Sequence, residues 1–140
     1  MRFLSVVSFV ACVTIYSAIQ PAYAAKSLAE NYNQLFEVIS KAGAIIFSNA
    51  KSEDEVFALA KHAVSYSLKD PESAQFRNLF IAGKDDTKAV CGEVNAKNSY
   101  GGYVGFKKFI TSGAAEMTNI EESDDESGMY IDMWCSENKK

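Results

Sequence analysis

The stretch from Cys91 to Phe109 holds the side chains of this chain best suited to binding another molecule. Amides, an ammonium group and aromatic rings gather there around Gly101 and Gly102, where a backbone without side chains lets a ligand approach closely. Tyrosines add rigid contact area of the kind found at interface anchors. We therefore select as candidate binding residues Asn95, Lys97, Asn98, Tyr100 and Tyr103.

The same stretch also has a purely structural interpretation. Asparagines satisfy the amides of turns, glycines adopt positive φ angles, and tyrosines can cover an apolar core. Residues that shape a turn can also bind, so the two interpretations are compatible and the sequence leaves both open.

Residues for catalysis are sparse. Glu93 is the one acid within the stretch, whereas a glycosidase needs two carboxylates in a cleft. The sole histidine, His62, is predicted on the polar side of a helix, away from any acid or nucleophile. Cys91 and Cys135, the two cysteines outside the N-terminal apolar run, have no histidine neighbours and are too few for zinc. The acidic run at 121–126 lacks the pattern of a calcium loop. We predict no catalytic residue, no metal and no cofactor, and we favour a protein that is not an enzyme.

The N-terminal residues have the pattern of an export signal. Met1-Arg2 gives a positive start, an apolar run follows from Phe3 to Ile19, and Ala22-Tyr23-Ala24 is a small-x-small site after Pro21. This pattern predicts a signal peptide over residues 1–24, cleaved after Ala24. The alternative is an uncleaved anchor, although the run is shorter than the roughly 20 residues of a membrane span. We expect a periplasmic or secreted protein without stable membrane insertion after cleavage.

Charge narrows the range of partners. Removing the predicted signal, which holds one basic residue, changes 14 basic and 18 acidic residues to 13 and 18, a net charge of −5. A mildly acidic domain lacks the electrostatic footprint of a protein that binds nucleic acid. We therefore expect no nucleic-acid partner, and a protein or a cell-envelope component remains as the partner class.

Cleavage also leaves two cysteines, Cys91 and Cys135. An even pair in an oxidising compartment predicts one disulfide, and buried free thiols are the alternative. The bridge would close a loop of about 45 residues and contribute roughly 3 to 4 kcal/mol in chain-entropy models.

Two helices are predicted first. Ser27-x-x-Glu30 and Ser52-x-x-Glu55 are capping boxes, and apolar residues follow each at helical spacing. The first helix is predicted to end near 48–49, with Glu37, Ser40 and Lys41 on its polar side. Its apolar stripe is Leu28, Tyr32, Leu35, Ile39, Ala42 and Ile46, with Phe36 and Gly43 beside it. The stripe of the second helix is Val56, Leu59, Ala60, Ala63 and Ser67.

Strands are predicted after the boundary at Asp70-Pro71, where proline favours a new short turn. The period changes from Phe76, and the predicted strands cover residues 79–82, 87–95, 103–111 and 129–135. A long loop with a mobile acidic part is predicted over 112–128. In the last strand, Met129, Ile131, Met133 and Cys135 would share one face. The fold class is α+β: two N-terminal helices packed on one face of a small antiparallel sheet of about four strands, with one disulfide, in a single domain over 25–140.

The predicted bridge constrains the order of the strands. Strands two places apart lie about 9.6 Å from each other, whereas a disulfide needs Cα atoms within about 7 Å. An in-order meander would leave one strand between Cys91 and a last strand that carries Cys135. The bridge therefore argues against that topology.

Two motifs carry a resemblance. D-P-x-S-A-x-F-R begins at Asp70, and C-G-x-V-N-A-K-N-x-Y-G-G-Y begins at Cys91. Together, behind a signal peptide, they resemble a group of small exported bacterial proteins of unassigned function. The resemblance covers about residues 64–110 and Trp134-Cys135, and leaves out the first helix and the acidic loop. It implies a bacterial, exported, disulfide-bearing domain and supplies no catalytic residues.

Three functions follow as hypotheses. The first is an exported, non-enzymatic binding domain that recognises its ligand through a loop over 95–103. The second is a cell-envelope hydrolase that uses Glu93. The third is an accessory structural subunit of an envelope assembly, which buries the stripe of the first helix.

Overall fold

The computed structural model describes residues 28–122 and 126–140. The predicted signal peptide and the capping residue Ser27 lie outside these ranges. Residues 33–140 form one compact unit, and residues 28–32 belong to the unit before it. In the described part of the chain, no helix has the length and apolar character that crossing a membrane requires.

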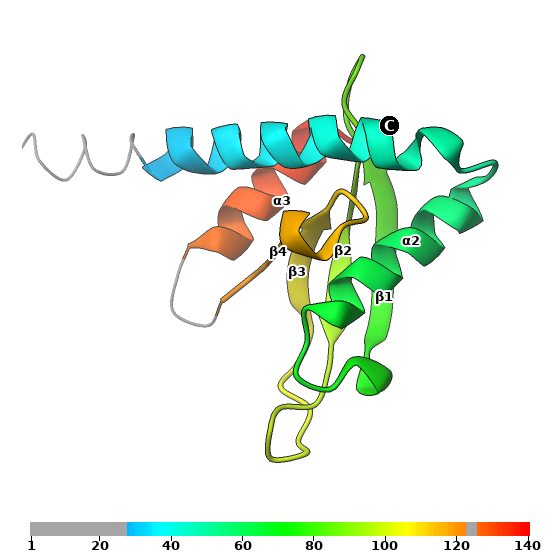
Figure 1. Cartoon of the computed structure of the whole chain (residues 1–140). Coiled ribbons are helices and arrows are strands. Elements are labelled where there is room, and N and C mark those ends of the chain that lie inside the picture. The colour runs from blue at the N-terminus through cyan, green and yellow to red at the C-terminus, as the bar shows by residue number, and fades with distance from the viewer. Residues whose placement is uncertain (1–27, 123–125) are drawn as a thin grey trace, which may run out of the picture. The chain divides into compact units, whose positions relative to one another are not determined.

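The described chain has the predicted α+β class (Figure 1). Residues 28–46 are helical and continue into the 3-10 turn η1. The sheet has four antiparallel strands in the order β1-β2-β3-β4, an in-order meander. The bounds of the labelled elements are η1 Phe47–Asn49, α2 Glu53–Tyr66, η2 Pro71–Ser73, β1 Gln75–Ala82, β2 Ala89–Asn95, β3 Lys107–Thr111, η3 Ala115–Met117, β4 Thr118–Ile120 and α3 Ser127–Glu137.

Helix α2 begins where its capping box predicts. The Ser52 hydroxyl accepts a hydrogen bond from the Glu55 N–H at 3.3 Å, and Glu55 Oε2 accepts one from the Lys51 N–H at 2.6 Å. Two amide groups that lack partners within the helix are thereby satisfied. His62 is exposed, as predicted.

One face of the sheet packs against α2 and forms the apolar core. Alternate residues of a strand point to the same face, so Val90 and Val94 of β2 face α2 together. Phe109 of β3 joins them and meets Phe76 edge to face, with ring centroids 6.0 Å apart. The remaining buried residues of this cluster are Phe47, Val56, Ala60 and Val64.

The first helix is rotated relative to its predicted stripe. Its buried residues are Phe36, Ile39, Ser40 and Gly43, whereas Leu35 is 40% exposed. A Cβ on Gly43 would overlap the Lys88 carbonyl oxygen, and the Ser40 carbonyl accepts a hydrogen bond from the Lys88 N–H at 2.8 Å. The prediction that Ser40 lies on the polar side is therefore wrong, because small residues allow the helix to approach the backbone next to β2.

The predicted last strand is a helix, α3. Tyr130, Ile131 and Cys135 are buried at helical spacing, whereas Met129 and Met133 are 57% and 42% exposed. The segment M-Y-I-D-M-W-C alternates like a strand, but it also places these three residues on one side of a helix. The predicted strand is therefore wrong, because a run of seven residues is too short to distinguish the two-residue period of a strand from the 3.6-residue period of a helix.

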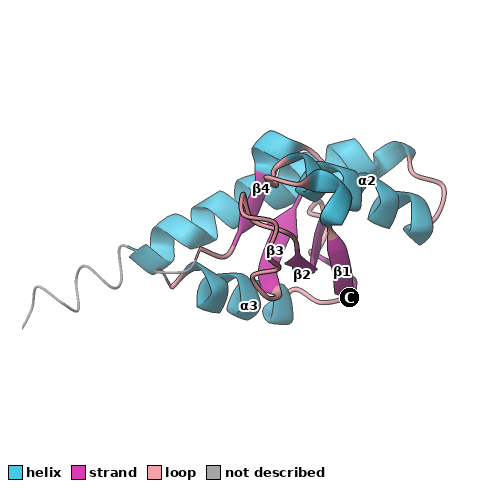
Figure 2. Ribbon diagram, turned by 90° about the horizontal axis from the view of Figure 1, so that it is seen from below, coloured by secondary structure: helices cyan, strands magenta, loops and turns pink. Residues whose placement is uncertain are grey.

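The disulfide between Cys91 and Cys135 is present, with Cα atoms 6.2 Å apart. Val90 and Val94 face α2, so Cys91 points to the opposite face, where α3 carries Cys135. Figure 2 shows the strands lying between α2 and α3. Two predictions are thereby corrected. Helices cover both faces of the sheet, whereas one covered face was predicted. The bridge is compatible with an in-order meander, because Cys135 belongs to a helix packed on the face of the sheet opposite α2 and not to a fourth strand.

The predicted loop at 112–128 contains regular structure. It holds η3 and the fourth strand, β4, which pairs with β3. The hydroxyls of Thr111 and Thr118 share a hydrogen bond of 2.6 Å across this pair. Strand β4 has three residues, too few for an alternating pattern to be recognised in the sequence, and residues 123–125 lie outside the described ranges.

Candidate functional site

The candidate site is the loop that connects β2 to β3, residues 96–106, here named the β2–β3 loop. In Figure 1 it projects from the end of the sheet away from the turn between β1 and β2. Four of the five predicted binding residues lie in it, and the fifth, Asn95, is the last residue of β2. The structure therefore brings all five into one segment.

The two asparagines shape this loop. The Asn98 side-chain oxygen accepts hydrogen bonds from the N–H groups of Tyr100 at 2.9 Å and Gly102 at 3.1 Å. The Asn95 side-chain oxygen accepts one from the Gly105 N–H at 3.0 Å. Gly101 and Gly105 have φ angles of +81° and +97°, which residues with a Cβ rarely adopt. The structural interpretation thus accounts for both side-chain oxygens, which bond to the loop's own backbone.

Lys97 and Tyr103 tie the loop to η2. The Ser73 hydroxyl accepts a hydrogen bond from the Lys97 N–H at 2.8 Å, and the Ser73 carbonyl accepts one from the Tyr103 hydroxyl at 3.3 Å. Lys97 and Tyr103 also form a bridge across the loop, with the ammonium 5.7 Å from the ring centroid. Ser73 belongs to the first sequence motif and Lys97 to the second, so the two motifs meet here.

Tyr100 stands apart from the other four residues. Its side chain is 96% exposed, compared with 47% for Tyr103. The neighbouring Val104 is 55% exposed and adds apolar surface to the same loop. The arrangement presents a large aromatic ring to solvent on a loop whose backbone is held by side-chain hydrogen bonds.

A groove of about 430 Å³ lies beside the loop, here named the loop groove. Its apolar lining comes from Leu68, Val94, Ala96, Val104 and Ile120, and three lysines and two glutamates also line it. Sequence reasoning missed this groove because its walls come from segments far apart in the chain: the residues after α2, strand β2, the loop and β4. No local motif records such a juxtaposition.

Glu93 lies on the other face of the sheet, in an ion pair. Arg77 donates to it from Nε at 2.9 Å and from Nη2 at 3.0 Å, and the Asn78 amide donates at 2.6 Å. The Arg77 guanidinium also stacks on the Phe106 ring, 3.8 Å from its centroid. The hydrogen bond from Arg77 is the main cause that lowers the pKa of Glu93 below its usual value. Such a carboxylate is held ionised, whereas a general acid needs a raised pKa.

A second cavity, of about 270 Å³, adjoins Glu93 and the disulfide. Asp132 of α3 also lines it, so two carboxylates share the cavity. Asp132 pairs with the Lys108 ammonium at 3.2 Å, and Glu93 pairs with Arg77. Both acids are therefore engaged by cations, which disfavours the pair of acid and base that a hydrolase uses. Residues 28–122 and 126–140 contain no cluster of three His, Cys, Asp or Glu side chains suited to a metal ion.

Comparisons with protein-family models, curated proteins and solved structures found no match to this chain. The resemblance of its two motifs to a group of exported bacterial proteins stays a prediction.

Proposed function

We propose that this protein is an exported, non-enzymatic binding domain that recognises a partner protein through the β2–β3 loop, with Tyr100 as the central contact. The observation that carries the proposal is the 96% exposure of Tyr100 at a loop that hydrogen bonds hold in one shape. Tyrosine is among the residues that dominate binding energy at protein interfaces. An isolated aromatic ring on a fixed loop contributes nothing to the core, so a contact with another molecule explains its position best.

The geometry of the loop supports this role. Binding costs free energy when loops and side chains must be ordered, and a loop already fixed in its bound shape avoids part of that cost. Asn98 fixes the tip, Asn95 fixes the return to β3, and Ser73 fixes the base. The loop can therefore present Tyr100 without a large ordering penalty.

Export rests on two supports. Residues 1–24 have the sequence pattern of a signal peptide: a positive start, an apolar run and a small-x-small cleavage site. The disulfide between Cys91 and Cys135 fits an oxidising compartment such as the periplasm or the exterior of the cell.

Affinity capture tests the proposal. Tagged protein, purified from cells that express the full chain, is incubated with envelope extract as wild type, as Tyr100→Ala and as Lys97→Ala/Tyr100→Ala. Tyr66→Ala is the matched control, because Tyr66 is 74% exposed and lies at the end of α2, outside the loop. We expect a partner that wild type and Tyr66→Ala retain and both loop variants lose at least tenfold. Equal capture by all four folded proteins would contradict the proposal.

An accessory subunit is the second candidate, and one observation favours it. Leu35, Val38 and Ile45 of the first helix are 40%, 53% and 75% exposed. Their spacing of three and seven residues places them on one side of the helix, as in the seam of a coiled coil. Sedimentation velocity on the purified protein tests this role: Ile45→Glu should dissociate an assembly that this face holds. A wild-type protein that is monomeric at all concentrations would contradict it.

A further inference from the structure

We propose that the loop groove receives Tyr100 of a second copy of this chain, and that two copies exchange these rings about a two-fold axis. The inference rests on the proposed function, because it names the partner protein that the β2–β3 loop recognises. In such a pair, Tyr100 of each copy enters the loop groove of the other, so the same contact is made twice.

The loop groove lies next to Tyr100 but is not filled by it. Asn98 lines the groove, and its side-chain oxygen accepts a hydrogen bond from the Tyr100 N–H at 2.9 Å. The Tyr100 ring is 96% exposed and is not part of the lining. A two-fold interface pairs one surface patch with itself, so a protruding group and a groove that can receive it must both lie on that patch. This loop region carries both.

The lining of the groove suits a tyrosine ring. Leu68, Val104 and Ile120 come from three different segments and give it apolar walls. Val104 is 55% exposed, so water contacts apolar surface that an incoming ring would cover. A volume of about 430 Å³ lies in the range of pockets that hold small ligands, so one aromatic side chain fits in it. The polar groups around these walls can pair with the tyrosine hydroxyl, which both donates and accepts hydrogen bonds.

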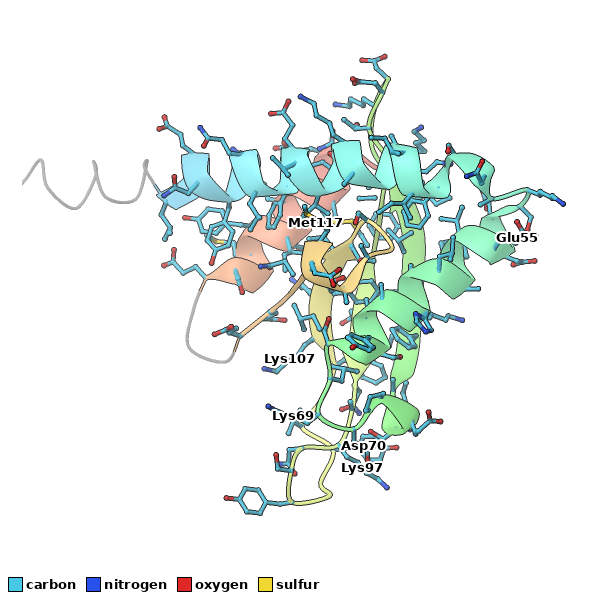
Figure 3. The ribbon with its side chains drawn as sticks, in the orientation of Figure 1. Glu55, Lys69, Asp70, Lys97, Lys107 and Met117 are labelled. Carbon is cyan, nitrogen blue, oxygen red and sulfur yellow. A yellow bond between two sulfur atoms is a disulfide. The ribbon has the colours of Figure 1, made fainter. Side chains whose placement is uncertain are left out.

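The charges around the groove favour a second copy over a strongly charged partner. Figure 3 shows Lys69 and Lys107 extending to the same side of the loop, and Lys97 to the other. Glu121 and Glu122 also line the groove, so the positive and negative charges offset each other. A two-fold contact makes use of such a mixture, because a lysine of one copy can face a glutamate of the other. Lys69 and Glu122 are both exposed and are the pair that we expect to meet across the axis.

The net charge of the chain, −4 for the full sequence, opposes the association of two copies. At physiological ionic strength, exposed charges separated by more than about 8 Å are largely screened, so this repulsion is weak compared with contacts inside the interface. One loop region from each copy forms a contact on the scale of a transient interface. We therefore expect a dimer that forms and dissociates with protein concentration.

Sedimentation velocity over a range of concentrations tests the inference, on protein purified from cells that express the full chain. Tyr100→Ala removes the ring, and Val104→Glu places a charge on an apolar wall at an exposed position. Tyr66→Ala is the matched control for the loss of an exposed tyrosine outside the loop. We expect wild type and Tyr66→Ala to dimerise with equal affinity. Each loop variant should weaken its own dimer at least a hundredfold, because both contacts are lost.

A mixture of the two loop variants tests the exchange of rings directly. Tyr100→Ala keeps an intact groove and Val104→Glu keeps an intact ring, so one of the two contacts forms in the mixed pair. Fluorescence-detected sedimentation of labelled Tyr100→Ala with unlabelled Val104→Glu measures this pair. We expect it to bind at least tenfold more tightly than either variant binds itself, which a purely structural role of the two residues would not produce.

Three results would overturn the inference: a wild type that is monomeric at all concentrations, a Tyr100→Ala variant that dimerises like wild type, or a mixture without the gain in affinity. A dimer that Ile45→Glu dissociates and Tyr100→Ala leaves intact would assign the contact to the first helix instead. The failure of this inference is distinguishable from that of the proposed function. If wild type is monomeric but Tyr100→Ala still loses its partner in affinity capture, the loop recognises a different protein.

Discussion

The two ends of the β2–β3 hairpin are held by different means. At the open end, Cys91 pairs with Ile110 and both are buried, and the disulfide joins this end to α3. At the loop end, polar side chains bond to their own backbone, and Tyr100 is left exposed. The open end thus derives its stability from the core, whereas the loop end derives its shape from local hydrogen bonds. The comparison predicts that changes at the open end alter stability and that changes at the loop end alter binding.

The largest effect on stability is expected for the double substitution Cys91→Ala/Cys135→Ala. The bridge joins residues 44 positions apart and restricts the unfolded chain. Without it the unfolded chain gains conformational entropy, which lowers the free energy of unfolding by about 3 to 4 kcal/mol. Urea unfolding followed by circular dichroism should show the lower midpoint. A midpoint equal to that of the wild type would mean that α3 and β2 are held together without the bridge.

Glu93→Gln is expected to have a smaller, pH-dependent effect of about 1 kcal/mol. The Arg77 pair lowers the pKa of Glu93 in the folded state, and the unfolded carboxyl returns to its usual value of about 4.5. Protonation therefore favours unfolding: the stabilisation is fully present above pH 4.5 and is lost as the pH falls through the lowered pKa. Thermal unfolding of both proteins between pH 3 and 7 should show curves that are separated at neutral pH and converge in acid. A constant separation would contradict the role of this ion pair.

The first helix shows what the sequence could predict and what it could not. The capping box at Ser52 and the turn at 83–86 act locally, so the start of α2 and the end of β1 at Ala82 follow from nearby residues. The buried side of the first helix does not follow, because Ser40 and Gly43 face inward only to fit the backbone at Lys88. Helix α3 and strand β4 were missed for a related reason: short segments take their structure from the sheet on which they pack.

The candidate site also has features that the sequence predicts and features that depend on the tertiary fold. The segment 95–103 stands out in the sequence by composition, and the structure places its five selected residues in one loop and its base. Their separate roles depend on geometry. Asn98 and Tyr100 look equally suited to binding in the sequence, but the Asn98 side-chain oxygen accepts two hydrogen bonds from the backbone and Tyr100 faces solvent. The loop groove requires the tertiary fold and has no sequence signal.

Asn98→Ala is expected to lower stability by about 0.5 to 1 kcal/mol, because two loop hydrogen bonds are lost at an exposed site. Its larger effect should be on binding, since the tip would no longer be held in one shape. Amide hydrogen exchange should increase at Tyr100 and Gly102 in this variant. Asn49→Ala, at an exposed asparagine in η1, is the matched control, and exchange that is equal in the two variants would refute the role of Asn98.

The smallest effect on stability is expected for Tyr100→Ala. A side chain that is 96% exposed has little core packing to lose, so the free energy of unfolding should stay within about 0.5 kcal/mol of wild type. A larger loss, measured by urea unfolding, would show that Tyr100 packs against the fold and is not available as a contact.

Photocrosslinking in living cells tests most directly the claim that this loop is a site of contact. A photoreactive phenylalanine derivative replaces Tyr100 in one strain and the exposed Tyr66 of α2 in another, and both strains express the full chain. We expect a discrete crosslinked species from position 100, which disappears when Asn98→Ala is added, and none from position 66. The same crosslinks from both positions, or none from position 100 in a protein that folds and is exported normally, would contradict the proposal.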